Sequence, residues 1–170
     1  MTHTTAASDL TLRDVTDDDR DLLFAIYAST RAEELARVPW TAEMKERFLD
    51  QQFESQDRWY REQYEGTQFH IVLVEGIAVG RLYLARTNDE LRVLDIALFP
   101  AHRARGIGTR LLQQVMREAA ATNRQVILHV EIFNRARRLY ERLGFRPLGE
   151  PTGVHQCMEW RPSIAMPAPS

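Results

Sequence analysis

The spacing of apolar positions predicts two helices in the first third of this 170-residue chain, after a short strand at residues 10–15. The first helix has apolar residues at helical spacing, at Leu22, Leu23, Ile26 and Tyr27. Thr16 and Asp19 have the form of a capping box before it, and Val38-Pro39 ends it. Thr41 caps the second helix, and Gly66 ends it. Its predicted inward stripe is Met44, Phe48, Leu49, Gln52 and Phe53.

The pattern then changes to β-rich runs. Residues 69–74 and 77–85 form a predicted hairpin around the turn Glu75-Gly76. A third strand, 91–99, ends at Pro100.

Helices and strands alternate in the last third of the chain. We expect a helix at 106–121, a strand at 126–132, a helix at 135–143 that Gly144 stops, and closing strands at 145–148 and 154–160. The inward residues of the first of these helices are Leu111, Leu112, Val115 and Met116. This order predicts an α/β fold with a mixed central sheet flanked by helices. The antiparallel middle argues against a doubly wound nucleotide-binding fold.

The length suits a single domain, which we place at residues 10–161, between a flexible leader (1–9) and a flexible tail (162–170). The leader lacks the features of a signal peptide, and no apolar run is long enough to cross a bilayer. Cys157 is the single cysteine, so an intrachain disulfide is excluded and a cytoplasmic location fits. The histidines are scattered, and we expect no metal site.

Charge is distributed unevenly, although the formal net charge is only −2. Residues 14–65 carry fourteen acids and seven bases, whereas residues 101–146 carry ten arginines and three glutamates. The near-neutral total argues against general affinity for nucleic acid. The first segment favours cations and the second favours anions, although solvated helix faces explain most of these charges.

The segment Arg103-Ala104-Arg105-Gly106-Ile107-Gly108 lies between a strand and a helix and suits a pyrophosphate. Gly106 and Gly108 let backbone amides approach closely, and Arg103 and Arg105 add positive charge. No Gly-Lys-Ser/Thr ending follows, and Leu111 replaces the third glycine of a dinucleotide fingerprint. From this motif alone, a plain helix start with solvated arginines is an equal alternative.

Two flanking blocks extend the motif. Ile96-Ala97-Leu98-Phe99-Pro100 precedes the glycine segment, and Asn134 is followed by Ala136-x-x-Leu139-Tyr140-x-x-x-Gly144-Phe145. Together they resemble the acetyl-CoA signature of the GCN5-related N-acetyltransferase (GNAT) family over roughly residues 69–160. One departure is that Asn134 precedes Tyr140 by six residues, where the common pattern has seven.

The resemblance implies a fold in which two central parallel strands splay apart, and it implies cofactor contacts. The backbone of Ile96, Ala97 and Leu98 would pair with pantetheine, and the Leu98 N–H would stabilise the oxyanion. The pyrophosphate would be held by Arg103, Ala104, Arg105, Gly106, Ile107, Gly108 and Thr109. Asn134 would bond the pantetheine chain, and Tyr140 would protonate the departing thiolate.

The general base is less defined. The resemblance points to His129, whose ordinary pKa suits the task, while Glu131 and Asp95 could act through water. A buried structural role is the alternative for His129, and Cys157 is not expected to carry an acyl group. The acceptor site is expected on the N-terminal helices, at Glu33, Glu34, Trp40, Trp59 and Tyr60. Packing for the aromatic residues and solvation for the carboxylates are the alternatives.

The sequence therefore predicts an N-acetyltransferase that moves an acetyl group from acetyl-CoA to an amine by direct attack in a ternary complex. A non-catalytic CoA-binding module on the same fold is the main alternative. An NAD-dependent oxidoreductase is a weaker one. The acceptor amine stays open, and neither nucleic acid nor a membrane is expected as a partner. Dimers are common in the family, so a homodimer is compatible with the resemblance.

Overall fold

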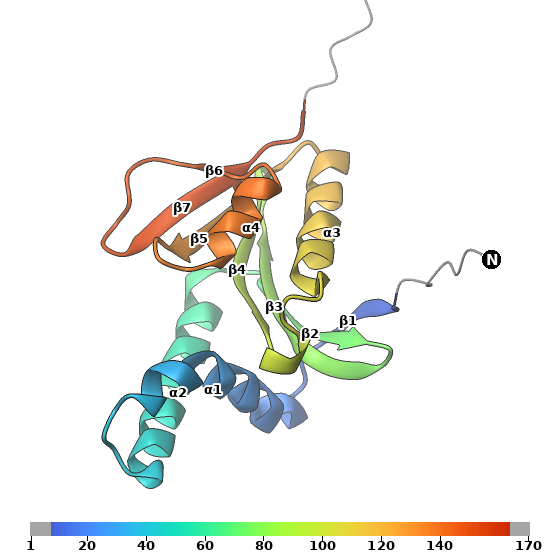
Figure 1. Cartoon of the computed structure of the whole chain (residues 1–170). Helices are drawn as coiled ribbons and strands as arrows, with labels where there is room; N and C mark the ends of the chain where they lie inside the picture. Colours follow the sequence, from blue (N-terminus) through green and yellow to red (C-terminus); the bar gives the residue numbers. More distant parts are fainter. Residues whose placement is uncertain (1–7, 164–170) are drawn as a thin grey trace, which may run out of the picture. The chain divides into compact units, whose positions relative to one another are not determined.

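The computed structural model describes residues 8–163, so the predicted leader and tail lie almost wholly outside the described residues. Seven strands form one sheet in the order β1-β2-β3-β4-β5-β7-β6 (Figure 1). The strands are β1 (Leu10–Asp14), β2 (Gln68–Val74), β3 (Ile77–Arg86), β4 (Glu90–Leu98), β5 (Gln125–Glu131), β6 (Arg146–Pro147) and β7 (His155–Trp160). The helices are η1 (Asp17–Asp19), α1 (Arg20–Ala36), α2 (Ala42–Gln63), η2 (Pro100–His102), α3 (Ile107–Ala121) and α4 (Ala136–Arg142). The predicted mixed α/β architecture is confirmed.

The chain divides into two compact units. The first comprises the chain up to Tyr83 together with Asp95–Ile107, and the second comprises Leu84–Leu94 together with the chain from Gly108 onwards.

The first unit contains α1, α2 and the strands β1 and β2. β1 pairs with β2 in antiparallel register, from Leu10 opposite Val74 to Asp14 opposite His70. The capping box predicted before α1 is present at Thr16 and Asp19, and Asp19 is held further by Arg13. Ring contacts of Phe53 with Phe24 and Tyr27 join the two helices. Thr41 caps α2 by accepting a hydrogen bond from the Met44 N–H at 3.2 Å.

The predicted inward stripe of α2 is wrong at two of its positions. Met44 is 51% exposed and Gln52 is also exposed, whereas Phe53 and Tyr60 are the buried residues. Phe53 and Tyr60 are seven residues apart, which is two helical turns, so they share one face. Met44 lies in the first turn, where α2 has not yet reached the core of the unit.

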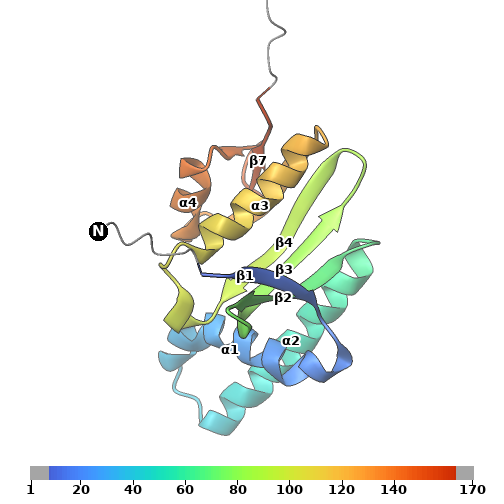
Figure 2. The same ribbon diagram turned by 90° about the vertical axis from the view of Figure 1, so that its right-hand side faces the viewer.

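The second unit packs α3 and α4 on the same face of its strands (Figure 2). Leu111, Leu112 and Val115 of α3 are buried as predicted, while Met116 is half-buried. β5 pairs with β7 in antiparallel register, and β6 pairs with the far edge of β7. Gly144 follows α4 with a φ of 97°, the left-handed conformation expected of a helix-ending glycine.

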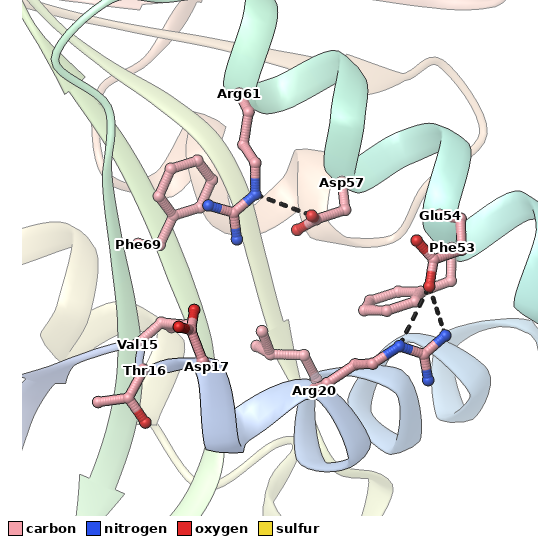
Figure 3. A pocket seen from close by; sticks show the side chains of 10 residues that line it. Val15, Thr16, Asp17, Arg20, Phe53, Glu54, Asp57, Arg61 and Phe69 are labelled. Carbon is pink, nitrogen blue, oxygen red and sulfur yellow. Dashed lines mark hydrogen bonds and ion pairs between the residues drawn. The ribbon is translucent and has the colours of Figure 1, made fainter.

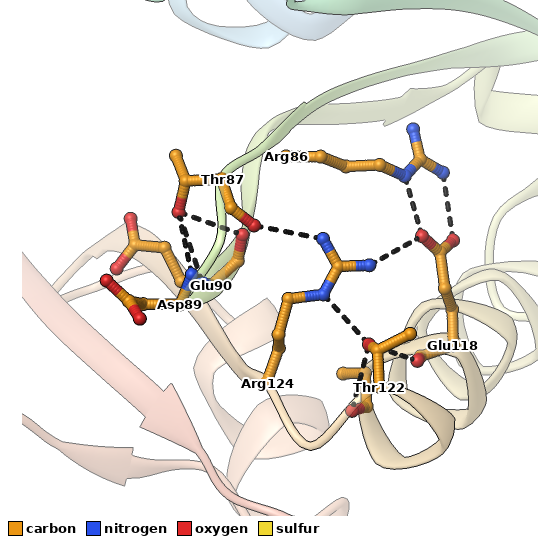
Figure 4. A network of polar contacts seen from close by, with 8 residues as sticks. Arg86, Thr87, Asp89, Glu90, Glu118, Thr122 and Arg124 are labelled. Carbon is orange, nitrogen blue, oxygen red and sulfur yellow. Dashed lines mark hydrogen bonds and ion pairs between the residues drawn. The ribbon is translucent and has the colours of Figure 1, made fainter.

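A polar network ties the end of α3 to the β3–β4 hairpin (Figure 4). Arg86 donates two hydrogen bonds to the Glu118 carboxylate, at 2.7 and 2.9 Å. Arg124 donates to Glu118 at 3.3 Å and to the Thr87 carbonyl oxygen at 3.0 Å. The hydrogen bond from Arg86 lowers the pKa of Glu118, so the network is charged at neutral pH.

The parallel pairing of β4 with β5 is short. Its register joins Glu90–Val93 to Gln125–Leu128, although β4 continues to Leu98 and β5 to Glu131.

Candidate active site

β4 carries one more residue than β3 between two of the hydrogen bonds that join these strands. The Thr87 N–H donates to the Glu90 carbonyl oxygen, and the Phe99 N–H donates to the Val79 carbonyl oxygen. Between these two bonds β3 advances eight residues (79 to 87) and β4 advances nine (90 to 99). One unmatched residue in an antiparallel pair is a β-bulge, which bends the strand.

Gly80 lies at a close approach of β3 to β4. A Cβ atom on Gly80 would lie 2.2 Å from the Ala97 carbonyl oxygen and 2.7 Å from Leu98 Cδ2. Only glycine permits so close an approach of two backbones. The segment Ile96–Leu98, predicted to pair with pantetheine, therefore contains the β4 residues that approach Gly80 closely.

The segment after η2 has the backbone expected of an anion cradle. Ala104 and Gly106 have φ angles of 58° and 79°, so left-handed residues alternate along it just before α3 begins at Ile107. A Cβ atom on Gly106 would meet no atom within 4 Å, so the backbone here is open. The first amides of a helix lack intrahelical acceptors. This segment can therefore offer N–H groups to a phosphate.

The two arginines of the motif differ in their surroundings. The Arg103 Nε donates to the Leu98 carbonyl oxygen at 3.0 Å, and its Nη2 donates to the Ser29 carbonyl oxygen at 3.4 Å. Arg103 thus ties its loop to the bulged strand and to α1. Arg105 is exposed.

Asp95, a candidate base, belongs to a buried charged cluster. The Arg81 Nε donates to Asp95 Oδ2 at 2.5 Å, and the Arg81 Nη2 donates to Gln56 Oε1 at 3.0 Å. Burial raises the pKa of Asp95, and the charge of Arg81 opposes that shift. The Arg81 guanidinium also lies 4.9 Å from the centre of the Tyr83 ring, and burial raises the pKa of Tyr83 to about 12. Asp95 is therefore engaged structurally by Arg81.

The predicted acceptor residues of the first unit are placed differently from one another. Tyr60 is buried, its ring centre lies 5.5 Å from that of Tyr83, and burial raises its pKa. Trp59 and Trp40 are 49% and 38% exposed, each in edge contact with a neighbouring ring. The last two candidates, Glu33 and Glu34, are exposed on α1, and Glu34 pairs with Arg31. Tyr60 is a core residue here, while the tryptophans retain accessible faces.

In the second unit, β5 and β7 present a row of polar side chains on one face. His129 lies opposite Cys157, and Glu131 lies opposite His155. His129 and Glu131 are exposed, whereas Leu128 and Val130 between them are buried. Partial burial and the positive charge of Arg92 lower the pKa of His129, which favours a neutral imidazole. Burial raises the pKa of the Cys157 thiol, which disfavours a nucleophilic thiolate.

Tyr140 and Asn134 lie in and before α4. Tyr140 is 7% exposed, with its ring centre 5.9 Å from that of Phe145. Asn134 Oδ1 accepts a hydrogen bond from the Ala136 N–H at 2.9 Å, so this amide oxygen supports the start of α4. The helix therefore begins only two residues after Asn134, in keeping with the shortened spacing to Tyr140.

Sequence reasoning missed Arg81, Gln56 and Gly80. Arg81 shares its strand parity with the buried Val79 and Tyr83, so the pattern already carried a charge at an inward position. A buried charge of this kind requires a partner of opposite charge, and Asp95 on the neighbouring strand β4 faces the same side of the sheet. Gln56 had no comparable signal.

Within the part of the chain that the structure describes, no helix is long and apolar enough to span a bilayer. The same residues contain no cluster of three or more potential metal ligands.

Comparison with known proteins identifies the family. The model of the acetyltransferase (GNAT) family matches residues 30–145, which is more than half of the chain, and the chain belongs to this family. The predicted family and the transferase class are confirmed.

Mycothiol acetyltransferase of Nocardiopsis dassonvillei is 36% identical over 63 residues, which cover 37% of this chain but only 19% of that protein. Two solved structures show the same fold. PaiA N-acetyltransferase from Thermoplasma acidophilum, in complex with coenzyme A, has a TM-score of 0.66 at 16% identity, covering 90% of this chain and 99% of its own. The ribosomal-protein-S18-alanine N-acetyltransferase of Escherichia coli has a TM-score of 0.59 at 22% identity. The match covers 95% of this chain and 99% of that protein's chain.

Proposed function

We propose that this chain transfers the acetyl group of acetyl-CoA to an amine by direct attack in a ternary complex. Beside the family membership, the backbone before α3 carries this proposal. Ala104 and Gly106 are left-handed there, and the space where a Gly106 side chain would begin is open. Backbone N–H groups at a helix start suit a pyrophosphate, and this segment fits that group.

Each proposed contact follows the family resemblance. The segment Ile96–Leu98 would pair with the pantetheine arm, and residues 103–109 would hold the pyrophosphate. Arg105 is the better placed of the two arginines for a phosphate, because Arg103 already donates to two carbonyl oxygens. The Nδ2 group of Asn134 would serve pantetheine, because its Oδ1 already accepts from the Ala136 N–H.

The chemistry needs few protein groups. A neutral amine attacks the thioester carbonyl carbon, and the new C–N bond converts the carbonyl oxygen into an oxyanion that the Leu98 N–H stabilises. Collapse of this intermediate breaks the C–S bond. Tyr140 then gives its proton to the departing thiolate, and the amine nitrogen loses a proton to the base.

We assign the base to His129. Its lowered pKa leaves the imidazole neutral at physiological pH, and it is exposed on β5. Glu131, on the same face of the strand, is the second choice. Asp95 is the least suited of the three because Arg81 occupies its carboxylate. For the acceptor we retain the exposed candidates Glu33, Glu34, Trp40 and Trp59.

The test is thermal denaturation with acetyl-CoA, NAD and ATP, followed by release of free CoA with a panel of amines. A ligand that binds only the folded state raises the melting temperature, so acetyl-CoA should do so and NAD should not. A shift with NAD and none with acetyl-CoA would overturn the proposal. Tight binding of acetyl-CoA without CoA release on any amine would favour the non-catalytic module.

A cytoplasmic location, a homodimer, and independence from nucleic acid and membranes complete the proposal. Light scattering of the purified chain tests the homodimer.

A further inference from the structure

The first unit holds a cavity that none of the proposed transfer residues lines. Its volume is about 240 Å³, and it lies where η1, α1, α2 and β2 meet (Figure 3). Leu23, Phe53 and Phe69 form its apolar wall, and charged side chains complete it. Drug-sized ligands occupy sites of about 300–1,000 Å³, so this cavity suits a smaller molecule.

Arg61 supplies fixed donors to this cavity. Its Nε donates to Asp57 Oδ2 at 2.8 Å, and its guanidinium lies 4.9 Å from the centre of the Phe69 ring. Neither Nη nitrogen of Arg61 has a hydrogen-bond partner among residues 8–163. A guanidinium held by a carboxylate and a ring loses little conformational freedom when it binds a ligand. Its free edge is suited to a carboxylate.

Asp17 supplies an acceptor. It lies on η1 at the opposite wall from Arg61 (Figure 3), and no described side chain or amide donates to its carboxylate. The pKa of Arg61 is raised first by the hydrogen bond to Asp57, and the more distant charge of Asp17 contributes in the same direction. The two groups therefore interact through space without a direct hydrogen bond.

The remaining charged residues of the cavity are already paired. Arg20 donates to Glu54 and, at 2.8 Å, to Asp50, so Glu54 already has a partner within the protein. This leaves one donor group and one acceptor group, facing each other above an apolar wall.

We propose that the cavity binds a small zwitterion, an α-amino acid with an apolar side chain. The ligand's carboxylate accepts from the Arg61 Nη groups, its ammonium donates to Asp17, and its side chain packs against Phe53 and Phe69. This site is independent of the proposed acetyl transfer, because it shares no residue with those assigned to that reaction.

The experiment measures binding of L-phenylalanine, L-leucine and L-methionine by calorimetry on the full chain. Two analogues, 2-phenylethylamine and 3-phenylpropanoate, lack the carboxylate and the ammonium respectively. We expect saturable binding of at least one amino acid with a Kd of about 1 mM or below. L-Phenylalanine should bind about tenfold more tightly than either analogue, because each lost group removes a charge-assisted hydrogen bond.

Two substitutions assign the groups. Asp17→Asn should weaken L-phenylalanine about tenfold and leave 3-phenylpropanoate unchanged, and Arg61→Gln should weaken L-phenylalanine while leaving 2-phenylethylamine unchanged. Asp18→Asn is the matched control, since Asp18 is exposed on the same η1 turn and does not line the cavity. Melting temperatures verify that each variant folds.

The proposal is overturned if none of the three amino acids binds saturably to the folded wild type. It is equally overturned if Asp17→Asn and Asp18→Asn bind L-phenylalanine alike. Neither result bears on acetyl-CoA binding, which is measured separately on the same preparation.

Discussion

Arg81 lies against Asp95 with its Nε 2.5 Å from Oδ2, and the side chain of Arg81 is 3% exposed while that of Asp95 is 20% exposed. Both residues point to the face of β3 and β4 on which Gln56 of α2 packs. The pair therefore joins two strands and a helix of the first unit through charge. A buried ion pair is a weak source of stability when intact, but loss of one partner leaves the other charge without compensation.

The first prediction concerns this pair. Asp95→Asn should lower the free energy of unfolding by about 3 kcal/mol, because Arg81 remains charged and buried. Urea unfolding followed by circular dichroism measures the change. Glu43→Gln is the control, since the Arg47–Glu43 pair is 80% and 76% exposed and should contribute less than about 1 kcal/mol. Equal effects of the two substitutions would contradict the structural role of Asp95.

The second prediction concerns the close approach of β3 and β4 at Gly80. Gly80→Ala should destabilise the fold by about 1–3 kcal/mol, because the new methyl group meets backbone that cannot rotate away. Gly108→Ala is the contrasting variant, since its Cβ would lie 3.7 Å from Leu139 Cδ2, an ordinary contact, within α3. It should keep or slightly raise the melting temperature. If the Gly80→Ala protein were as stable as the Gly108→Ala protein, β3 and β4 would not approach each other closely at Gly80.

The third prediction isolates the phosphate contact. Gly106 and Gly66 have φ angles of 79° and 75°, and a Cβ on either would meet no atom within 4 Å. Gly106→Ala and Gly66→Ala therefore introduce the same backbone strain, about 1 kcal/mol, at two different places. Only Gly106→Ala should weaken acetyl-CoA, by about tenfold or more, in calorimetry. We substitute alanine at position 106 and not a β-branched residue such as valine, because a β-branched side chain at this φ would distort the loop itself.

The sequence predicted the elements well where local chemistry decides them. The capping box at Thr16, the turn at Glu75-Gly76 and the stop at Gly144 all depend on residues near in sequence, and all three are present. The inward face of α2 was wrong at Met44 because tertiary packing decides which turns of a long helix reach the core. The Arg81–Asp95 pair joins residues fourteen positions apart on different strands, so only their shared inward parity hinted at it.

The residues of the candidate site also divide into those that local sequence reveals and those that only tertiary contacts define. The glycine segment is recognisable because a left-handed backbone leaves a compositional trace at Gly106, although Ala104 adopts that conformation without one. The sequence showed that the spacing from Asn134 to Tyr140 is one residue short, but it did not show that Asn134 Oδ1 accepts a hydrogen bond from the Ala136 N–H. Engagement of Arg103 by carbonyl oxygens left no trace in sequence.

The fourth prediction is a pH dependence. The pKa of His129 is lowered by partial burial, then by Arg92 and His155, so the folded protein binds this proton less well than the unfolded chain. Stability relative to His129→Gln should therefore fall as the pH drops through about 6.5 towards the folded pKa. Histidine NMR titration should place the His129 midpoint below 6.5, and Arg92→Gln should raise it. A midpoint unmoved by Arg92→Gln, with Arg138→Gln as control, would exclude that electrostatic cause.

If His129 is also the base, the turnover rate should rise with pH through the His129 titration midpoint. The substitution His129→Gln should abolish this pH-dependent rise in rate. A His129→Gln enzyme with an unchanged rate and profile would transfer the role to Glu131 or to water.

The last prediction tests Tyr140, whose side chain is buried on α4 with its ring centre 5.9 Å from that of Phe145. Tyr140→Phe keeps the ring and its packing but removes the only proton that the side chain can give. Thiolate is a fair leaving group, so we expect the lower end of the usual contribution of general acid catalysis, about 100-fold in turnover. Affinity for acetyl-CoA should stay nearly unchanged, because no binding contact is assigned to the hydroxyl. A structural tyrosine would instead lower the melting temperature and leave turnover intact in the folded fraction. Turnover, acetyl-CoA affinity and melting temperature measured on one preparation separate the two roles, and full turnover in Tyr140→Phe would remove the acid role.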